Sequence, residues 1–384
     1  MAWFLADLKS GTILIRSLDV ISGSVSPQLN KAGGITAKVK LPLVAHIGNR
    51  SARIDAAQIV EGRTVLGLEE NGVILDAGPI WQTDFDFDSW ELTLTAAGLR
   101  SYYEHRYVLP PNVASHIGAD SAWAGLSLRT IAKRVLQQAQ AWTGAALPLV
   151  FESDFAGSSE RSYKGADLQT VDEVLTKISE VAGGPDVDFR PEFTDDRLRV
   201  QWRVVTGSPE LRQAGADWVW DMATPVSPVR AASKQRDASV LVSRDWETGG
   251  TPEGAQLPIA ATAVSSVLTA ANYPIMESAS GRDSVTTQAV LQGHADAAVT
   301  VGSMLLEQFS FSASKYPVTD LPDGRTVPSG PWLGQYRPGD YGVLAVAENP
   351  WSGAARIRVR LLGYSYEYGA ESVKFTTAGS RAGV

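Results

Sequence analysis

Hydrophobic and polar residues alternate along most of the first hundred positions of the chain. Runs of this kind, each bounded by polar or glycine-containing turns, predict strands at 12–18, 62–69, 72–87 and 90–97. Asn71 and Gly72 separate the second run from the third, and this dipeptide is typical of a two-residue hairpin turn. The pattern therefore predicts an antiparallel, barrel-like β domain over 1–105.

The middle of the chain changes to a spacing of three and four residues between apolar positions, which is typical of helices. One such face begins near Ser127 and predicts a helix in a domain at 106–160. A second helix is expected to begin at Thr170, because Thr170 and Glu173 have the spacing of a capping box. Together with the hairpin pattern that follows, this helix predicts a small α+β insert at 161–225.

The last part of the chain returns to alternation and predicts a C-terminal β-barrel domain over 226–384. Within it, a segment rich in Gly, Ala, Pro and Ser at about 248–282 is interpreted as a long loop or arm, and 283–309 as a helix. The run GQYRPGDYGVLAV, at 334–346, is interpreted as the turn and first strand of that barrel. The predicted fold class is α+β, mostly β, with two β-barrel-like domains flanking a mixed middle region.

Composition excludes several classes of protein. The formal net charge is -8, from 42 acidic and 34 basic residues, so binding to nucleic acid phosphates or an anionic membrane is not favoured. Cysteine is absent, which excludes disulfides, thiol nucleophiles and thiolate zinc sites. Asp7 interrupts the short apolar patch at the N-terminus, so we expect neither a signal peptide nor a membrane span there.

Asp84, Asp86 and Asp88 are spaced two apart, which on a strand would place three carboxylates on one face. Such a face could hold a hard cation, although Ser89 and Thr95 occupy positions where a calcium loop needs Gly and Glu. A solvated strand face is the simpler interpretation. The same acids, with neighbouring tryptophans, could also form a carbohydrate site, because glycosidases use paired carboxylates.

No other catalytic pattern stands out. The 4 histidines are isolated, and the sequence has no nucleophile elbow, Walker loop or dinucleotide-binding glycine motif. We therefore expect no catalytic residue, no cofactor and no resident metal, and the chain is not predicted to be an enzyme.

Tryptophan is frequent, with 11 residues, and this residue type is enriched in protein interfaces. Trp332 and Trp351 lie beside Pro and Gly in loop-like sequence. These two, with nearby Tyr336 and Arg337, are the predicted contacts between subunits.

Several segments taken together resemble the minor tail proteins, or trimeric tail-hub (baseplate hub) proteins, of long-tailed actinobacteriophages. They are WELTLTAAGLRSYYEHRYVLP (90–110), TVDEVLTKISEVAGGPDVDFRPEFTDDRLRVQWRV (170–204), YRPGDYGVLAVAENPW (336–351) and IRVRLLGYSYEYG (357–369). The resemblance covers most of the chain.

The resemblance implies that the N-terminal and C-terminal barrels lie side by side and that three copies form a ring. This homotrimer would face the sixfold tail tube with six barrels, contact the distal tail protein and the tape measure protein, and hold the central fibre or spike. It would be made in the host cytoplasm, reside in the virion at the tail tip, and close the channel until DNA passes transiently, without stable membrane association.

Two alternatives remain open at this point. The first is a carbohydrate-binding or carbohydrate-cleaving tail protein that acts at the host surface through Asp84, Asp86 and Asp88. The second is a β-rich binding protein with no link to phage, which would be a stable monomer.

Overall fold

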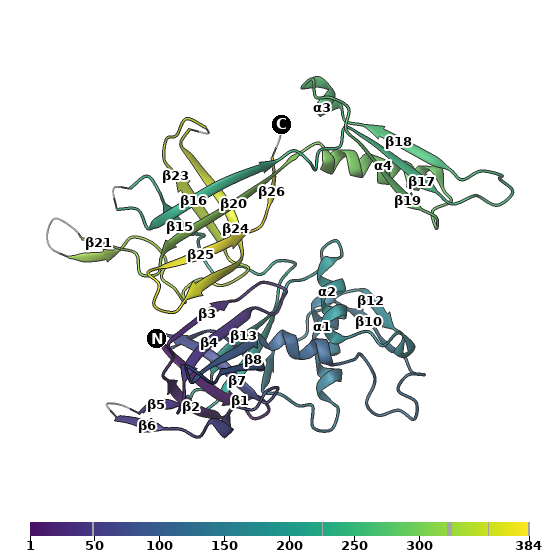
Figure 1. Cartoon of the computed structure of the whole chain (residues 1–384). Helices are drawn as coiled ribbons and strands as arrows, with labels where there is room; N and C mark the ends of the chain where they lie inside the picture. Colours follow the sequence, from purple (N-terminus) through teal and green to yellow (C-terminus); the bar gives the residue numbers. More distant parts are fainter. Residues whose placement is uncertain (48–49, 225, 321–324, 352, 383–384) are drawn as a thin grey trace. The chain divides into compact units, whose positions relative to one another are not determined.

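The computed structural model describes residues 1–47, 50–224, 226–320, 325–351 and 353–382. Strands predominate over helices, which confirms the predicted α+β, mostly β class (Figure 1). The chain divides into two compact units, of which the first comprises Met1–Ala231 with Phe311–Thr376 and the second Ala232–Ser310 with Thr377–Val384. Across the described residues, no helix combines the length and apolarity that a membrane crossing requires.

The N-terminal strands of the first unit form an antiparallel series in the order β4-β9-β8-β7-β1-β2-β5-β6. Their bounds are β1 (Ala2–Asp7), β2 (Ile13–Leu18), β3 (Ser22–Ser26), β4 (Gly34–Lys40), β5 (Val44–Ile47), β6 (Arg50–Arg53), β7 (Thr64–Glu70), β8 (Val73–Asp86) and β9 (Glu91–Ala97). Asn71 and Gly72 have φ values of 49° and 83°, which are the left-handed values of a tight hairpin turn. The predicted hairpin between β7 and β8 is thus confirmed.

Two short helices accompany the N-terminal strands: η1 (Ala56–Gln58) lies between β6 and β7, and η2 (Leu99–His105) follows β9. The region 121–206 comes next, and we call it the insert from here on. Its elements are β10 (Ser121–Leu126), α1 (Leu128–Gln140), β11 (Leu149–Phe151), β12 (Ser159–Tyr163), η3 (Gly165–Asp167), α2 (Val171–Glu180), β13 (Val187–Phe193) and β14 (Val200–Thr206). Both predicted helix starts are confirmed. Ser127 caps α1, and the Thr170 hydroxyl accepts the Glu173 N–H at 3.2 Å while the Glu173 carboxylate accepts the Thr170 N–H at 2.8 Å.

The insert and the N-terminal strands share one hydrophobic core. The apolar faces of α1 and α2 contact the same cluster as the buried Phe4 of β1 and Trp202 of β14. The Trp202 indole N–H donates to the carbonyl of Ala77 on β8 at 3.1 Å, so the polar atom of this large side chain is satisfied inside the core.

The C-terminal strands are β15 (Trp218–Asp221), β16 (Val229–Asp237), β20 (Leu305–Ser314), β21 (Val318–Asp320), β22 (Thr326–Pro328), β23 (Tyr341–Val346), β24 (Ala355–Glu367) and β25 (Ser372–Thr377). Apart from β21 and β22, which pair with each other in a separate sheet, these strands continue the sheet of the N-terminal strands. The division between the two units falls within β16, β20 and β25. The strand β24 pairs with β3, with Tyr366 opposite Val25 and Glu367 opposite Ser24. The order β25-β24-β3-β4-β9 is therefore continuous and open.

The sheets do not close into barrels in the described part of the chain, which corrects the prediction of two barrel-like domains. The physical reason is that β24 pairs with β3. This pairing occupies strand edges that would have to pair within one domain for a separate barrel to close. Aromatic side chains fill the space beside β23, β24 and β25. Phe311 stacks on Phe375 at 4.5 Å between ring centroids, and Trp220 and Tyr336 lie 5.0 and 4.9 Å from the ring of Phe375.

The second unit is a small sheet covered on one face by a helix. The strand order of this sheet is β18 (Ala260–Val264), β17 (Arg244–Gly249), β19 (Glu277–Arg282). The helix α4 (Gln288–Gly302) packs on the sheet, where its Leu291 and Ala295 contact Ala261 (Figure 1). The unit also contains α3 (Ser266–Ala270) and β26 (Ser380–Ala382).

This arrangement corrects the prediction of a long arm at 248–282, since that segment contributes β18, α3 and β19. The predicted helix at 283–309 is shorter, at 288–302, and β20 begins at Leu305. The Ala, Gly and Ser residues of the segment suggested a loop, but small side chains also allow a helix to lie close to a sheet.

Candidate functional site

Asp186 lies just before β13, and its carboxylate joins segments that are far apart in the sequence. One oxygen accepts the side-chain amide of Asn30 at 2.9 Å, and the other accepts the backbone N–H of Leu211 at 2.7 Å and the guanidinium of Arg360 on β24. In return, the Asn30 amide oxygen accepts the N–H of Val187 at 2.7 Å. The N-terminal segment, the insert and the C-terminal strand thus meet at one buried carboxylate.

A second buried carboxylate, Asp340, fixes the turn before β23. It accepts the indole N–H of Trp218 and the backbone N–H of Arg337, each at 3.0 Å. Burial raises the pKa of Asp340, and these hydrogen bonds oppose that rise. The turn predicted at the start of GQYRPGDYGVLAV is therefore held by an interior carboxyl group.

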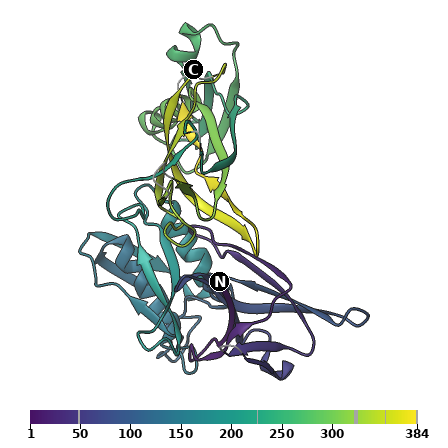
Figure 2. The same cartoon turned by 90° about the vertical axis from the view of Figure 1, so that its left-hand side faces the viewer.

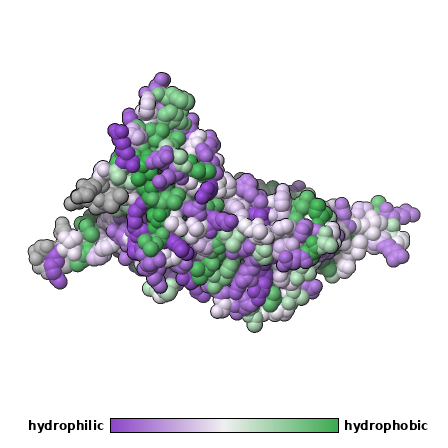
Figure 3. All heavy atoms as spheres, turned by 90° about the horizontal axis from the view of Figure 1, so that it is seen from below, coloured by the Kyte–Doolittle hydropathy of each residue, from purple (hydrophilic) through white to green (hydrophobic). Residues whose placement is uncertain are grey.

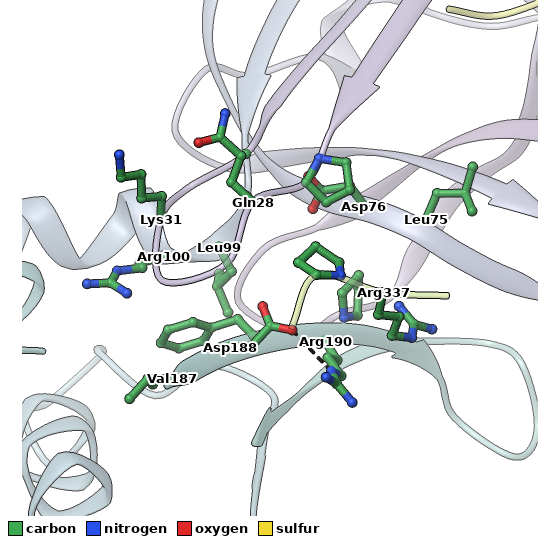
Figure 4. Close-up of a pocket in the computed structure, with 16 residues that line it drawn as sticks. Gln28, Lys31, Leu75, Asp76, Leu99, Arg100, Val187, Asp188, Arg190 and Arg337 are labelled. Carbon is green, nitrogen blue, oxygen red and sulfur yellow. Dashed lines mark hydrogen bonds and ion pairs between the residues drawn. The ribbon is translucent and has the colours of Figure 1, made fainter. Parts of the chain in front are cut away.

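A small cavity of about 30 Å³ lies between β8, β13 and the turn at 337–338 (Figure 4). Asp76, Asp188, Arg190 and Arg337 line it, and Asp188 pairs with Arg190 at 3.1 Å. One oxygen of Asp76 accepts the N–H of Ala77 at 2.9 Å, whereas the other has no hydrogen-bond partner among the described residues. A space of this size admits one or a few water molecules, so a buried water could satisfy that oxygen.

Burial raises the pKa of Asp76 to about 7. The N–H of Ala77 opposes the rise, the carboxylate of Asp188 adds to it, and the guanidinium of Arg337 opposes it. Asp76 therefore exchanges a proton near neutral pH, and the charge that it carries when ionised lies among Asp188 and the two arginines.

We call this set, Asn30, Asp76, Asp186, Asp188, Arg190, Arg337, Asp340 and Arg360, the polar junction. It holds the terminal strands and the insert together within the first unit. Among the residues that the structure describes, no group of three or more His, Asp or Glu is arranged to hold a metal ion. The polar junction thus combines ion pairs with one carboxyl group of raised pKa, Asp76, and its role is to connect segments of the fold.

The three predicted acids lie at the far end of β8. Asp84 and Asp86 belong to the strand, but β8 ends at Asp86, so Asp88 lies in the following turn. The Asp86 carboxylate accepts the N–H groups of Asp88 and Ser89 at 2.8 and 3.0 Å, which shapes that turn and lowers the pKa of Asp86. The expected single strand face with three carboxylates is therefore not formed, while a ligand at these acids stays a prediction.

The predicted subunit contacts occupy different environments. Trp351 is 76% exposed, whereas Tyr336 is buried in the aromatic core of its own chain. Trp332 is half-buried with its ring edge-on to Tyr316, and Arg337 lines the cavity. The structure does not gather these four residues on one surface.

Sequence reasoning missed most of the polar junction. Asp76 had a visible signal, because it is the single charged residue in the apolar run GVILDAGPIW. Asp186 and Arg360 had no such signal, since the side chains that they bind lie more than a hundred residues away along the chain.

No protein-family model matches the sequence, and neither does any curated protein sequence. Solved structures do match. The 43 kDa tail protein of prophage MuSo2 from Shewanella oneidensis has a TM-score of 0.57 at 11% identity, covering 98% of both chains. A tail protein from Neisseria meningitidis MC58 has a TM-score of 0.54 at 12% identity, covering 98% of this chain and 96% of that one. The chain has the fold of these tail proteins.

The tail-protein fold includes both units, because the match covers nearly the whole chain. At such low identity the likeness concerns the backbone arrangement, and the polar junction of this chain is described from its own residues.

Proposed function

We propose that the chain is a structural protein of a phage tail and that three copies of it form a hub ring at the tail tip. The observation that carries this proposal is the likeness to two tail proteins over almost the full length of each chain. A match of this extent concerns the entire architecture, whereas a shared single domain would be compatible with many functions.

The internal arrangement of the first unit supports the ring. Because β24 pairs with β3, one chain presents its N-terminal and C-terminal β regions as neighbours. Three copies would then supply six β regions, the number needed to face a sixfold tail tube. The polar junction connects these two β regions within one chain, so each subunit would enter the ring with the two regions held in a fixed arrangement.

In this proposal the ring contacts the distal tail protein, the tape measure protein and the central fibre or spike of the tail tip. It closes the channel until DNA ejection, and DNA passes through it transiently. The chain is synthesised in the host cytoplasm and carries no catalytic activity of its own. The origin in an actinobacteriophage stays a prediction from the sequence.

Labelling of virions tests the location. Gold-tagged antibodies against the chain should bind one end of purified tails of the phage that encodes it, when viewed by electron microscopy. Labelling along the whole tube, or of capsids alone, would contradict a hub at the tail tip.

A further inference from the structure

The turn between β8 and β9 exposes large aromatic side chains. Phe87 is 81% exposed and Trp90 is 58% exposed, and the Phe85 ring lies edge-on to Phe87 with centroids 4.8 Å apart. The turn lies at the outer end of the long β8–β9 hairpin, which projects from the first unit (Figure 2). We call Phe85, Phe87 and Trp90, with the acids Asp84 and Asp88, the hairpin tip.

The backbone at Trp90 indicates that this side chain does not serve the fold. Its φ is 58°, in the left-handed region that Gly and Asn adopt far more readily than a bulky residue. The carbonyl of Trp90 accepts the N–H of Leu41 at 2.9 Å, which any residue could do. Within the described part of the chain, the Trp90 indole makes no hydrogen bond and no ring contact. A strained, exposed aromatic residue is a candidate anchor for a protein partner.

An apolar groove lies elsewhere on the first unit, between β2, β5 and the turn that joins β13 to β14. Its volume is about 410 Å³. Its lining combines Ile13, Leu14, Ile15, Ala45, Ile54 and Leu198 with Arg16, Asp196 and Arg197. Leu14 and Leu198 are 42% and 66% exposed, so the groove offers apolar surface that the chain itself does not cover. Figure 3 views the molecule from below Figure 1, the side on which β2 and β5 lie, with hydrophobic residues in green.

The charges of the groove and the hairpin tip are complementary. The Arg16 guanidinium lies over the ring of Phe193 at 5.0 Å and donates to the carbonyl of Arg197 at 2.8 Å, and no described carboxylate pairs with it. On the hairpin tip, Asp84 and Asp88 likewise form no ion pair with any described residue.

The remaining charges of the groove are already engaged. Arg197 pairs with Glu69 at 2.7 Å. The Asp196 carboxylate accepts the Thr194 hydroxyl at 2.5 Å and the Leu198 N–H at 2.9 Å. The groove thus presents one unpaired cation beside apolar surface, and the hairpin tip presents unpaired acids beside aromatic rings.

We propose that the hairpin tip of one copy docks into the apolar groove of the next copy. Phe87 and Trp90 cover the apolar lining, and the acids of the tip meet Arg16. This inference rests on the proposed self-association and names the surfaces that carry it. The tip and the groove are different surfaces, so the contact is head-to-tail, and a contact of this type closes into a ring when its rotation fits.

Cross-linking between two singly substituted chains tests the contact. The chain has no cysteine, so Phe87→Cys and Leu14→Cys each carry one thiol. When the two purified chains are mixed and oxidised, the disulfide between unlike chains should form in large excess over either symmetric dimer, because a disulfide needs the two Cα atoms within about 7 Å. Leu257→Cys, at a side chain that is 76% exposed in the second unit, is the matched control and should cross-link to neither. Symmetric dimers in statistical proportion, or no cross-link, would overturn the inference.

A second pair of variants separates this inference from the proposed function. Phe87→Ser with Trp90→Asn should weaken self-association about 30-fold or more, as expected for the loss of aromatic anchors. The variant should remain folded, because both residues are exposed and Asn suits the left-handed position. Leu257→Asn should change nothing.

Three outcomes distinguish the two ideas. Association of the parent chain that is lost in the double variant supports both. Association that is equal in the parent and in the double variant overturns the docking contact and leaves the proposed ring standing. A parent chain that stays monomeric at every concentration, both alone and with the distal tail protein, and that gives no cross-link, overturns both.

Discussion

Asp76 allows the pH dependence of folding to be traced to one buried carboxyl group. The side chain is 6% exposed, and burial raises its pKa to about 7 from the ordinary value of 3.8. Between these two pH values the folded chain holds a proton on Asp76 that the unfolded chain has released. Because the folded state binds more protons in this window, the contribution of Asp76 to stability is full below about pH 4 and falls as the pH rises through about 7.

The size of the effect follows from the two pKa values. Their difference corresponds to about 4 kcal/mol of folding free energy, at about 1.36 kcal/mol for each pH unit. We take this as an upper limit, because the cavity beside Asp76 can admit water that solvates the ionised carboxylate.

The replacement Asp76→Asn removes the charge and keeps the shape. The amide oxygen can still accept the N–H of Ala77, and the amide N–H groups can donate toward Asp188. We expect the variant to match the parent near pH 4 and to be more stable near pH 8, by as much as about 4 kcal/mol. Urea denaturation across this range measures the difference as a change in midpoint at constant slope.

The matched control is Asp120→Asn, at an exposed aspartate of the same unit. It should leave the pH dependence of stability parallel to that of the parent. The reasoning about Asp76 is refuted if Asp76→Asn also runs parallel to the parent, or if it is the less stable protein near pH 8.

The remaining predictions also concern unfolding by urea. Gly67→Ala would place its methyl carbon 2.2 Å from the ring of Phe4, so overpacking should lower stability by about 1–3 kcal/mol, and an unchanged midpoint would contradict the close contact. Asp186→Ala leaves the guanidinium of Arg360 without its nearest carboxylate and should cost about 3 kcal/mol, and the further change Arg360→Met should restore part of this loss. If the double variant is no more stable than Asp186→Ala, the buried pair does not hold the polar junction. Thr170→Ala should cost about 1 kcal/mol through the lost helix cap, whereas Thr170→Ser should cost little.

Local features of the fold could be predicted from the sequence. The hairpin turn at Asn71-Gly72 and the capping box of Thr170 and Glu173 each depend on a few adjacent residues whose backbone preferences are strong. The mostly β class followed from alternation over many short runs, since that pattern reflects which face of a strand is buried.

Long-range features could not be predicted in the same way. The pairing of Tyr366 with Val25 joins strands that lie more than three hundred residues apart in the sequence. Nothing in the sequence of either strand identifies the other as its partner. The same holds for the polar junction, where Asp186 receives hydrogen bonds from both ends of the chain. In the second unit, Ala and Gly residues gave a loop-like composition to a segment that packs as strands and a short helix.

The most direct test of the central claim is the mass of the purified chain in solution, measured by light scattering over a range of concentrations, alone and with the distal tail protein. A trimeric hub predicts a particle of three times the 41.1 kDa of one chain when the chain is alone, or a complex that contains three copies of the chain once the partner is added. A particle of 41.1 kDa under every condition, with no response to the partner, would contradict it.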